Sequence, residues 1–104
     1  MAWIYLLLAG LLEIVWAYTM KLSDGFTRIN YAAITIAAMV GSVVLLAMAM
    51  KSLPLGTAYT IWTGIGAIGA FTIGILFLGE AMTPMRIGAA VLIVSGLVLM
   101  KMSS

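Results

Sequence analysis

The sequence contains no cysteine and no histidine, and only 8% of its 104 residues are charged. Without cysteine there is no disulfide framework, no thiol nucleophile and no zinc–thiolate or iron–sulfur site. Without histidine, the commonest metal ligand and the commonest acid–base side chain are missing. The net charge of +2 is too small to indicate a nucleic-acid partner. These absences argue against an enzyme, a metal site and a nucleic-acid binder.

Apolar residues make up 65% of the chain. A soluble domain is about half apolar and about a quarter charged. A chain of this size cannot hide so much apolar surface in one water-soluble core, because small domains bury a smaller share of their surface. The composition therefore indicates an integral membrane protein.

The few charged residues separate long uncharged runs at 29–50, 52–79 and 87–100, and residues 2–20 are uncharged apart from Glu13. A helix needs roughly 20 apolar residues to cross a bilayer core of ~30 Å. Lipid permits helices or closed barrels, and unbroken apolar runs indicate helices. We predict one all-α transmembrane domain, residues 1–104, with four spans at about 2–20, 30–50, 56–79 and 84–101.

Two boundaries carry local signals. The segment from Lys51 to Gly56 has the composition of a tight turn. Thr83 is expected to cap the N-terminus of the last span, with Pro84 at its first position, where a missing N–H costs nothing. The first segment lacks the basic n-region of a cleaved signal and has a carboxylate in its middle.

The positive charges are almost evenly divided between the two sides of the membrane. Lys51 and Lys101 fall on the side of the N-terminus, whereas Lys21, Arg28 and Arg86 fall on the other. The positive-inside rule needs an imbalance to fix orientation. We therefore expect the chain to insert in both orientations.

Glu13 is the one charged residue in the middle of a span. It follows Ala2 by eleven residues, which is roughly 16 Å along a helix and about half the membrane depth. A charge there costs on the order of 2.5–3.5 kcal/mol on insertion scales, so such residues are functional-site candidates. A low dielectric favours the neutral acid, and the side chain is expected to hold either a proton or a cation in competition. The alternative is a permanently protonated acid that makes a helix–helix hydrogen bond.

Aromatic residues are expected around this carboxylate. Trp16 lies at i+3 on the face of Glu13. In the third span, Tyr59 and Trp62 are three residues apart and share a face. Their rings attract cations, and their O–H and N–H groups can hydrogen-bond a carboxylate. The alternative for these aromatics is an interfacial belt, which fits Tyr59 better than Trp62.

Ser42 carries the hydroxyl in the middle of the second span. It is expected either to hydrogen-bond the carboxylate or to bond its own helix backbone. Small residues then mark packing and bending positions. Gly64 and Gly66 belong to a glycine-rich third span, where Gly66, Ala70 and Gly74 form a small-residue stripe, and Gly96 lies in the fourth span.

Four short helices enclose little space, and transporters commonly pair two repeats around a midplane site. The chain has no internal repeat. An antiparallel homodimer with an oppositely inserted copy would supply one, and would bring two Glu13 side chains near a shared axis.

Several segments resemble the small multidrug resistance family over essentially the whole chain: residues 12–17 (LEIVWA), 51–59 (KSLPLGTAY), 61–67 (IWTGIGA) and 79–80 (GE). The resemblance implies a dual-topology homodimer in a bacterial inner membrane. It also implies the exchange of cytoplasmic cations for protons, driven by the proton-motive force without a further cofactor.

Within that family the chain is most similar to the guanidinium exporters, because Trp16 follows Glu13 and a WTGIGA segment follows Ile61. The resemblance implies that Glu13 binds protons and substrate, that Ser42 and Trp16 orient it, and that Tyr59 and Trp62 line the site. A planar guanidinium with N–H donors suits a carboxylate.

The chain departs from the guanidinium-exporter branch at three places, so other functions are also considered. These are residues 18–20 (YTM), Thr60, and Asn30 with Tyr31 in place of a proline. The nearest alternative is a multidrug antiporter for quaternary ammonium and other hydrophobic cations. A passive ion channel and a non-transporting assembly protein are further alternatives.

Overall fold

The computed structural model describes residues 1–103, which form four helices joined by short connections, with no strand in this range. The helices are α1 (Ala2–Leu22), α2 (Ile29–Ala49), α3 (Leu55–Leu78) and α4 (Pro84–Met102). Each is long and apolar enough to cross a membrane. The predicted all-α architecture with four spans is therefore confirmed. Helix α1 departs most from its predicted range, since it continues to Leu22 rather than ending near residue 20.

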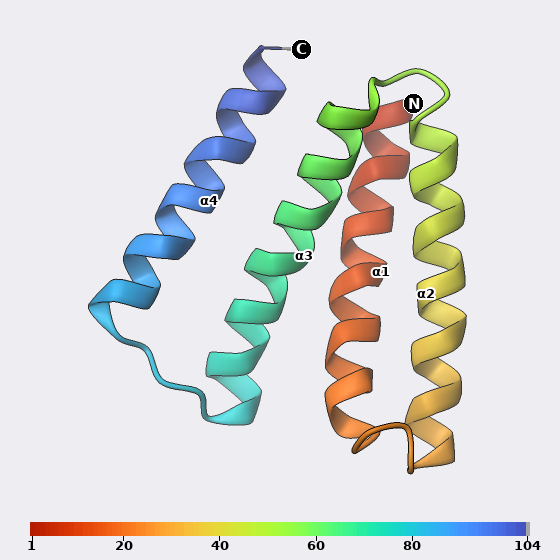
Figure 1. The fold of residues 1–104 in the computed structure, drawn as a ribbon, viewed down its shortest axis with the longest axis vertical. Coiled ribbons are helices and arrows are strands. Elements are labelled where there is room, and N and C mark those ends of the chain that lie inside the picture. Colours follow the sequence, from red (N-terminus) through yellow and green to blue (C-terminus); the bar gives the residue numbers. More distant parts are fainter. Residues whose placement is uncertain (104) are drawn as a thin grey trace.

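The four helices form a flat arrangement measuring 40 × 34 × 16 Å. Helix α1 packs against both α2 and α3, whereas α4 packs against α3 alone (Figure 1). The start of α1, the end of α4 and the α2–α3 connection lie at one end of the bundle, and the other two connections lie at the opposite end (Figure 1). The first three helices thus form a bundle to which α4 is attached along one side.

Small side chains let the first three helices approach closely. Ala9 of α1, Ala49 of α2 and Ala58 of α3 have no exposed surface, and they cluster with Leu6, Leu46 and Ile61. Lipid tails are as apolar as these side chains, so close packing rather than water exclusion holds such helices together.

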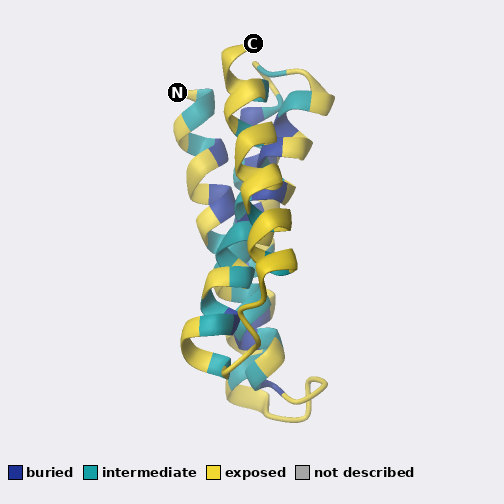
Figure 2. Cartoon of the chain, turned by 90° about the vertical axis from the view of Figure 1, so that its left-hand side faces the viewer, coloured by how far each residue is buried: buried dark blue, intermediate teal, exposed yellow. Residues whose placement is uncertain are grey.

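Helix α4 differs from the other three because none of its residues is buried. Figure 2 shows it as an almost wholly exposed helix along the side of the bundle. Leu92 is 75% exposed and Leu99 is 65% exposed. Lipid or another protein must therefore cover an apolar surface of this extent in the cell.

A left-handed glycine ends α3. Gly79 has φ 68° and ψ 24°, and the Glu80 amide donates to the Gly74 carbonyl at 3.0 Å. Helices commonly end in this way, because glycine adopts positive φ without a steric penalty. Thr83 then caps α4 by accepting a hydrogen bond from the Arg86 amide at 3.2 Å, with Pro84 at the first position. The predicted start of the last span is confirmed.

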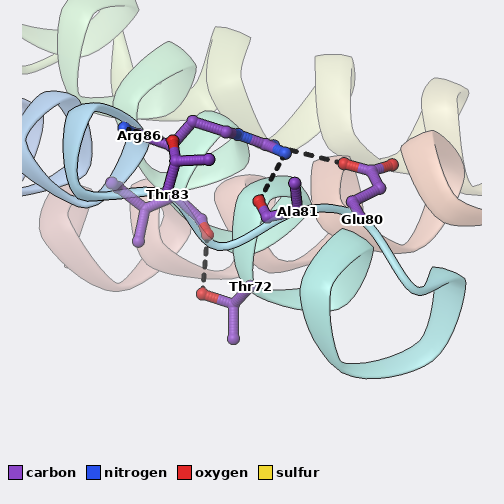
Figure 3. Close-up of polar contacts among 6 residues, drawn as sticks. Thr72, Glu80, Ala81, Thr83 and Arg86 are labelled. Carbon is purple, nitrogen blue, oxygen red and sulfur yellow. Dashed lines mark hydrogen bonds and ion pairs between the residues drawn. The ribbon is translucent and has the colours of Figure 1, made fainter.

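Arg86 ties the first turn of α4 to the α3–α4 connection. Its guanidinium donates to the Ala81 carbonyl at 2.7 Å and to the Glu80 carboxylate at 3.3 Å (Figure 3). The same group lies 5.2 Å from the centre of the Phe71 ring on α3. Because α4 has no buried residue, these polar contacts fix the start of the helix relative to α3.

Replacing Gly79 with alanine should destabilise the protein by about 1–2 kcal/mol, the usual cost of a left-handed conformation for a residue with a Cβ. The matched control is Gly88→Ala in α4, where an added Cβ meets nothing within 4 Å and φ is not positive. That change should be neutral or slightly stabilising, since alanine favours helix. Unfolding free energies in mixed micelles measure both, and equal effects would contradict this account of the turn.

Candidate functional site

Glu13 lies on α1 with its carboxylate directly against the backbone of α3. A Cβ added at Gly66 would overlap the Glu13 carboxylate, so the carboxylate can lie here only beside a glycine. Gly66 is buried and Glu13 is partly buried. The close approach of the two helices thus brings the one mid-span carboxylate into contact with a glycine-lined surface.

One carboxylate oxygen of this residue is unsatisfied. Glu13 Oε1 is buried and has no hydrogen-bond partner within residues 1–103. Trp16 Nε1, a donor one turn further along α1, is likewise buried without a partner there. Buried polar atoms are normally paired, and each exception needs an explanation such as a ligand or a missing partner. These two atoms are therefore the strongest indication of a binding site in the described chain.

A hydrogen-bond relay crosses all three packed helices next to Glu13. Trp62 Nε1 donates to Ser42 Oγ at 2.9 Å, and Ser42 Oγ donates to the Ala9 carbonyl oxygen at 2.6 Å. Ser42 has no exposed surface. Ala9 lies four residues before Glu13, which is about one helical turn. The relay thus connects α3 and α2 to α1 one turn from the carboxylate.

The acceptor of the Ser42 hydroxyl differs from both sequence-based expectations. It bonds neither Glu13 nor its own helix but the backbone of α1. The physical reason is the small size of Ala9, which is fully buried and lets α2 come within reach of the α1 carbonyl. In this single chain neither Ser42 nor Trp16 donates a hydrogen bond to Glu13 Oε1. Their role as residues that orient Glu13 stays a prediction.

Tyr59 and Trp62 form an aromatic pair on α3. Their ring centres are 5.6 Å apart and their planes are inclined by 51°. Trp62 is partly buried, whereas Tyr59 is 52% exposed. Tyr59 also lines a groove of about 470 Å³ between α3 and α4, together with Thr63, Gly64 and Gly96. The pair therefore extends from the relay at Ser42 to an open surface of the molecule.

The predicted packing glycines behave differently from one another. A Cβ at Gly64 would overlap Leu97, so this residue permits the contact between α3 and α4. At Gly96 an added Cβ meets nothing within 4 Å. Gly96 is therefore not a packing residue within one chain, and a role in bending is likewise not visible in an unbroken α4.

The small-residue stripe predicted in the third span does not pack against a neighbouring helix throughout its length. Gly66 accommodates the Glu13 carboxylate, and Gly74 accommodates the carboxylate of Glu80. Ala70, between them, is exposed. At both glycines the missing side chain makes room for an acidic group, which the spacing alone did not indicate.

Sequence reasoning missed a second polar contact between α1 and α2. Thr19 Oγ1 and Thr35 Oγ1 lie 2.6 Å apart in the interior. Thr35 donates to the Tyr31 carbonyl at 2.8 Å, so Thr19 is the donor to Thr35, and the Trp16 carbonyl lies 3.3 Å from Thr19 Oγ1. Thr19 follows Trp16 by three residues, so their shared helix face could have drawn attention to it. This contact fixes α1 against α2 on the far side of Trp16 from Glu13.

No group of three or more His, Cys, Asp or Glu side chains in residues 1–103 could hold a metal ion. The site thus offers one carboxylate, aromatic rings and hydroxyls. Such a set suits an organic cation with N–H donors, because its charge and its donors are both satisfied by a carboxylate. Aromatic faces stabilise the same kind of ion.

Four apolar spans around an unpaired carboxylate at mid-depth define a small multi-pass membrane protein with an internal polar site. The family model described as Small Multidrug Resistance protein matches residues 1–93, and the chain belongs to this family. The resemblance to the small multidrug resistance family that the sequence motifs indicated is therefore confirmed.

Individual relatives are similar over their whole length. The chain is 54% identical over 104 residues to a protein named guanidinium exporter from Escherichia coli (strain K12), which covers 100% of this chain and 99% of the relative. Proteins of the same name from Citrobacter freundii and Salmonella typhimurium show the same identity and coverage. The alignment therefore leaves no room for a large insertion or an additional domain in these relatives.

The relay through Ser42 should couple α2 and α3 energetically. In a double-mutant cycle, Ser42→Ala and Trp62→Phe should show a coupling energy of about 0.6 kcal/mol, and up to about 1.7 kcal/mol, as for other hydrogen bonds between membrane helices. Unfolding free energies in mixed micelles measure this.

Thr72→Val on α3 is the control, because that exposed hydroxyl donates to the Ile68 carbonyl of its own helix, at 2.9 Å. It should change stability little. Additive effects of Ser42→Ala and Trp62→Phe would show that the relay does not hold the helices together.

Proposed function

We propose that this chain is the subunit of a proton-coupled exporter of guanidinium and small guanidinyl compounds. The observation that carries the proposal is the buried, unpaired Oε1 of Glu13 at mid-depth. The relatives named guanidinium exporters, 54% identical over the whole chain, support the choice of substrate. The same relatives, named as exporters, favour transport over catalysis.

Guanidinium fits the chemistry of the site. It is planar, charged and rich in N–H donors, so it can give two parallel hydrogen bonds to one carboxylate. Gly66 keeps the space beside Glu13 free of a side chain other than the carboxylate. The rings of Trp16, Tyr59 and Trp62 would flank the cation and stabilise it through their faces. A quaternary ammonium ion has no N–H donor and would leave the carboxylate oxygen unpaired.

Competition at Glu13 would couple transport to protons. One carboxylate carries either a proton or a cation, and binding of one releases the other. If the site opens to the two sides of the membrane in turn, the inward proton gradient drives the cation outward. The proton-motive force is then the sole source of energy, with no further cofactor.

A homodimer would complete the transport pathway. Helix α4 has no buried residue within the chain, and Gly96 faces open space. An exposed apolar helix with small residues is suited to helix–helix association in lipid. Lys51 and Lys101 lie at one end of the bundle and Lys21, Arg28 and Arg86 at the other, a near-balance that favours insertion in both orientations. We therefore propose an antiparallel pair, in a bacterial inner membrane, with the two Glu13 side chains sharing one site.

Replacing Glu13 with glutamine should abolish guanidinium-driven transport currents in proteoliposomes on a solid-supported membrane. Glutamine keeps the shape of the side chain but removes both the negative charge and the exchangeable proton. Glu80→Gln is the matched control, since Glu80 lies 42% exposed in the α3–α4 connection and pairs with Arg86. Its currents should remain close to those of the unaltered protein.

The same recordings separate the alternative functions. Current with guanidinium but not with tetrapropylammonium supports the proposal. Current with tetrapropylammonium alone would make the chain a multidrug antiporter. Guanidinium current without proton countertransport would indicate a channel, and full activity of Glu13→Gln would contradict any role for the carboxylate.

Replacing Gly66 with alanine should weaken guanidinium binding by about tenfold, equivalent to about 1.4 kcal/mol. The added Cβ overlaps the Glu13 carboxylate and must displace it. Gly56→Ala is the control on the same helix, because nothing lies within 4 Å of a Cβ there. Guanidinium titrations of the purified proteins measure both, and an unchanged affinity for Gly66→Ala would show that the position of the carboxylate in this structure is not the binding position.

A further inference from the structure

A second groove lies on the outside of the bundle, away from the Glu13 carboxylate. It has a volume of about 400 Å³, and its floor is α3 while α1 and α4 form its walls. Ile61 and Ile65 line the floor, and Leu7 and Val98 line the two walls. The groove exists because α4 packs against α3 but not against α1. Almost all of its lining is apolar, so at membrane depth it must be filled by something apolar.

The groove shares Leu97 with the one that Tyr59 lines, but all its other lining residues are different. Ile61 lies two residues from both Tyr59 and Thr63, which line the other groove. Residues two apart on a helix point to nearly opposite sides. The two grooves therefore occupy opposite faces of the α3–α4 pair. The face with Tyr59 and Gly96 is the one we assign to a second copy of the chain, which leaves this groove open to lipid.

The ammonium group of Lys101 lies at one end of the groove. Lys101 Nζ lies 4.4 Å from the centre of the Trp3 ring, and both residues line the groove. This contact bridges the beginning of α1 and the end of α4. It holds the ammonium group above the apolar lining, at the level where a membrane-spanning helix meets the headgroups.

Within residues 1–103, the charged side chains at this end of the bundle are all basic. Lys51, in the α2–α3 connection, and Lys101, near the end of α4, lie at this end of the bundle (Figure 1). Among residues 1–103 the acidic side chains are elsewhere: Glu13 at mid-depth, and Asp24 and Glu80 in the connections at the opposite end. No carboxylate of the described chain neutralises Lys101. A ligand that fits both parts of the groove must be apolar along its length and anionic at one end.

We propose that this groove binds an anionic phospholipid, with one acyl chain along Ile61, Ile65 and Val98 and the phosphate at Lys101. An ammonium group has three donors, and the Trp3 ring occupies one side of it, so donors remain for phosphate oxygens. Basic pockets between membrane helices bind anionic headgroups for the same reason. Below the contact between Trp3 and Lys101, the lipid would fill the gap between α1 and α4.

The test counts lipids retained by the purified protein in native mass spectra, with dioleoylphosphatidylglycerol and dioleoylphosphatidylcholine supplied in equal amounts. The expected result is a preference of about fivefold for the anionic lipid, the effect of one basic residue near a membrane surface. Lys101→Gln should bring the ratio close to one. Lys51→Gln removes the same charge at the same end but outside the groove, and should leave the preference intact.

The acyl-chain part has its own pair of variants. Val98→Trp fills the groove and should abolish retention of the lipid, whereas Leu99→Trp, on the next residue and outside the groove, should not. If Val98→Trp fails to fold, the lipid preferences of Lys101→Gln and Lys51→Gln still test whether the groove binds an anionic lipid.

Four outcomes would overturn the proposal. These are equal retention of the two lipids, equal losses in Lys101→Gln and Lys51→Gln, displacement of the lipid by millimolar inorganic phosphate, and a Val98→Trp variant that changes the oligomeric state. Displacement by phosphate would indicate a headgroup contact alone, and a changed oligomeric state would show that protein rather than lipid fills the groove.

Discussion

The carboxylate of Glu13 lies against the backbone of α3 at Gly66, inside a bundle that offers its Oε1 no hydrogen bond. Placing a polar group in this way costs free energy unless another group satisfies it. Two sets of hydrogen bonds hold α1 in place on either side of Glu13. The relay through Ser42 lies one turn before this residue, and the bond between Thr19 and Thr35 lies beyond Trp16. The polar contacts thus surround the carboxylate and leave it available to a ligand.

The fourth helix is held in place by different contacts from the first three. Helices α1 to α3 are held by close contacts between small residues and by two sets of buried hydroxyls. Helix α4 is attached through Gly64, through Leu97 and through the Arg86 contacts at its first turn. It leaves two apolar grooves on opposite faces. We propose that one face contacts a second copy of the chain and that the other contacts lipid. Helix α4 would then pack against a protein on one side and a phospholipid on the other.

Much of the fold was predictable because charge and length alone fix where an apolar chain crosses a bilayer. The four spans, the Thr83 cap and the mid-depth position of Glu13 followed from the sequence. The rotation of each helix about its axis did not, because spans that are apolar all round carry no polar face to orient them. That is why the sequence did not indicate that Ser42 bonds the Ala9 carbonyl or that Gly74 accommodates Glu80. Gly96 faces open space in one chain, so its packing role stays a prediction.

The account depends on one carboxylate that exchanges a proton for a cation, and proton release on binding measures this directly. Guanidinium is added to the purified protein in a weakly buffered solution whose pH is monitored, with Glu13→Gln as the reference. Binding is expected to release protons from the unaltered protein and none from the variant. Binding of guanidinium to the unaltered protein without proton release would contradict it, because substrate and proton would then occupy separate sites.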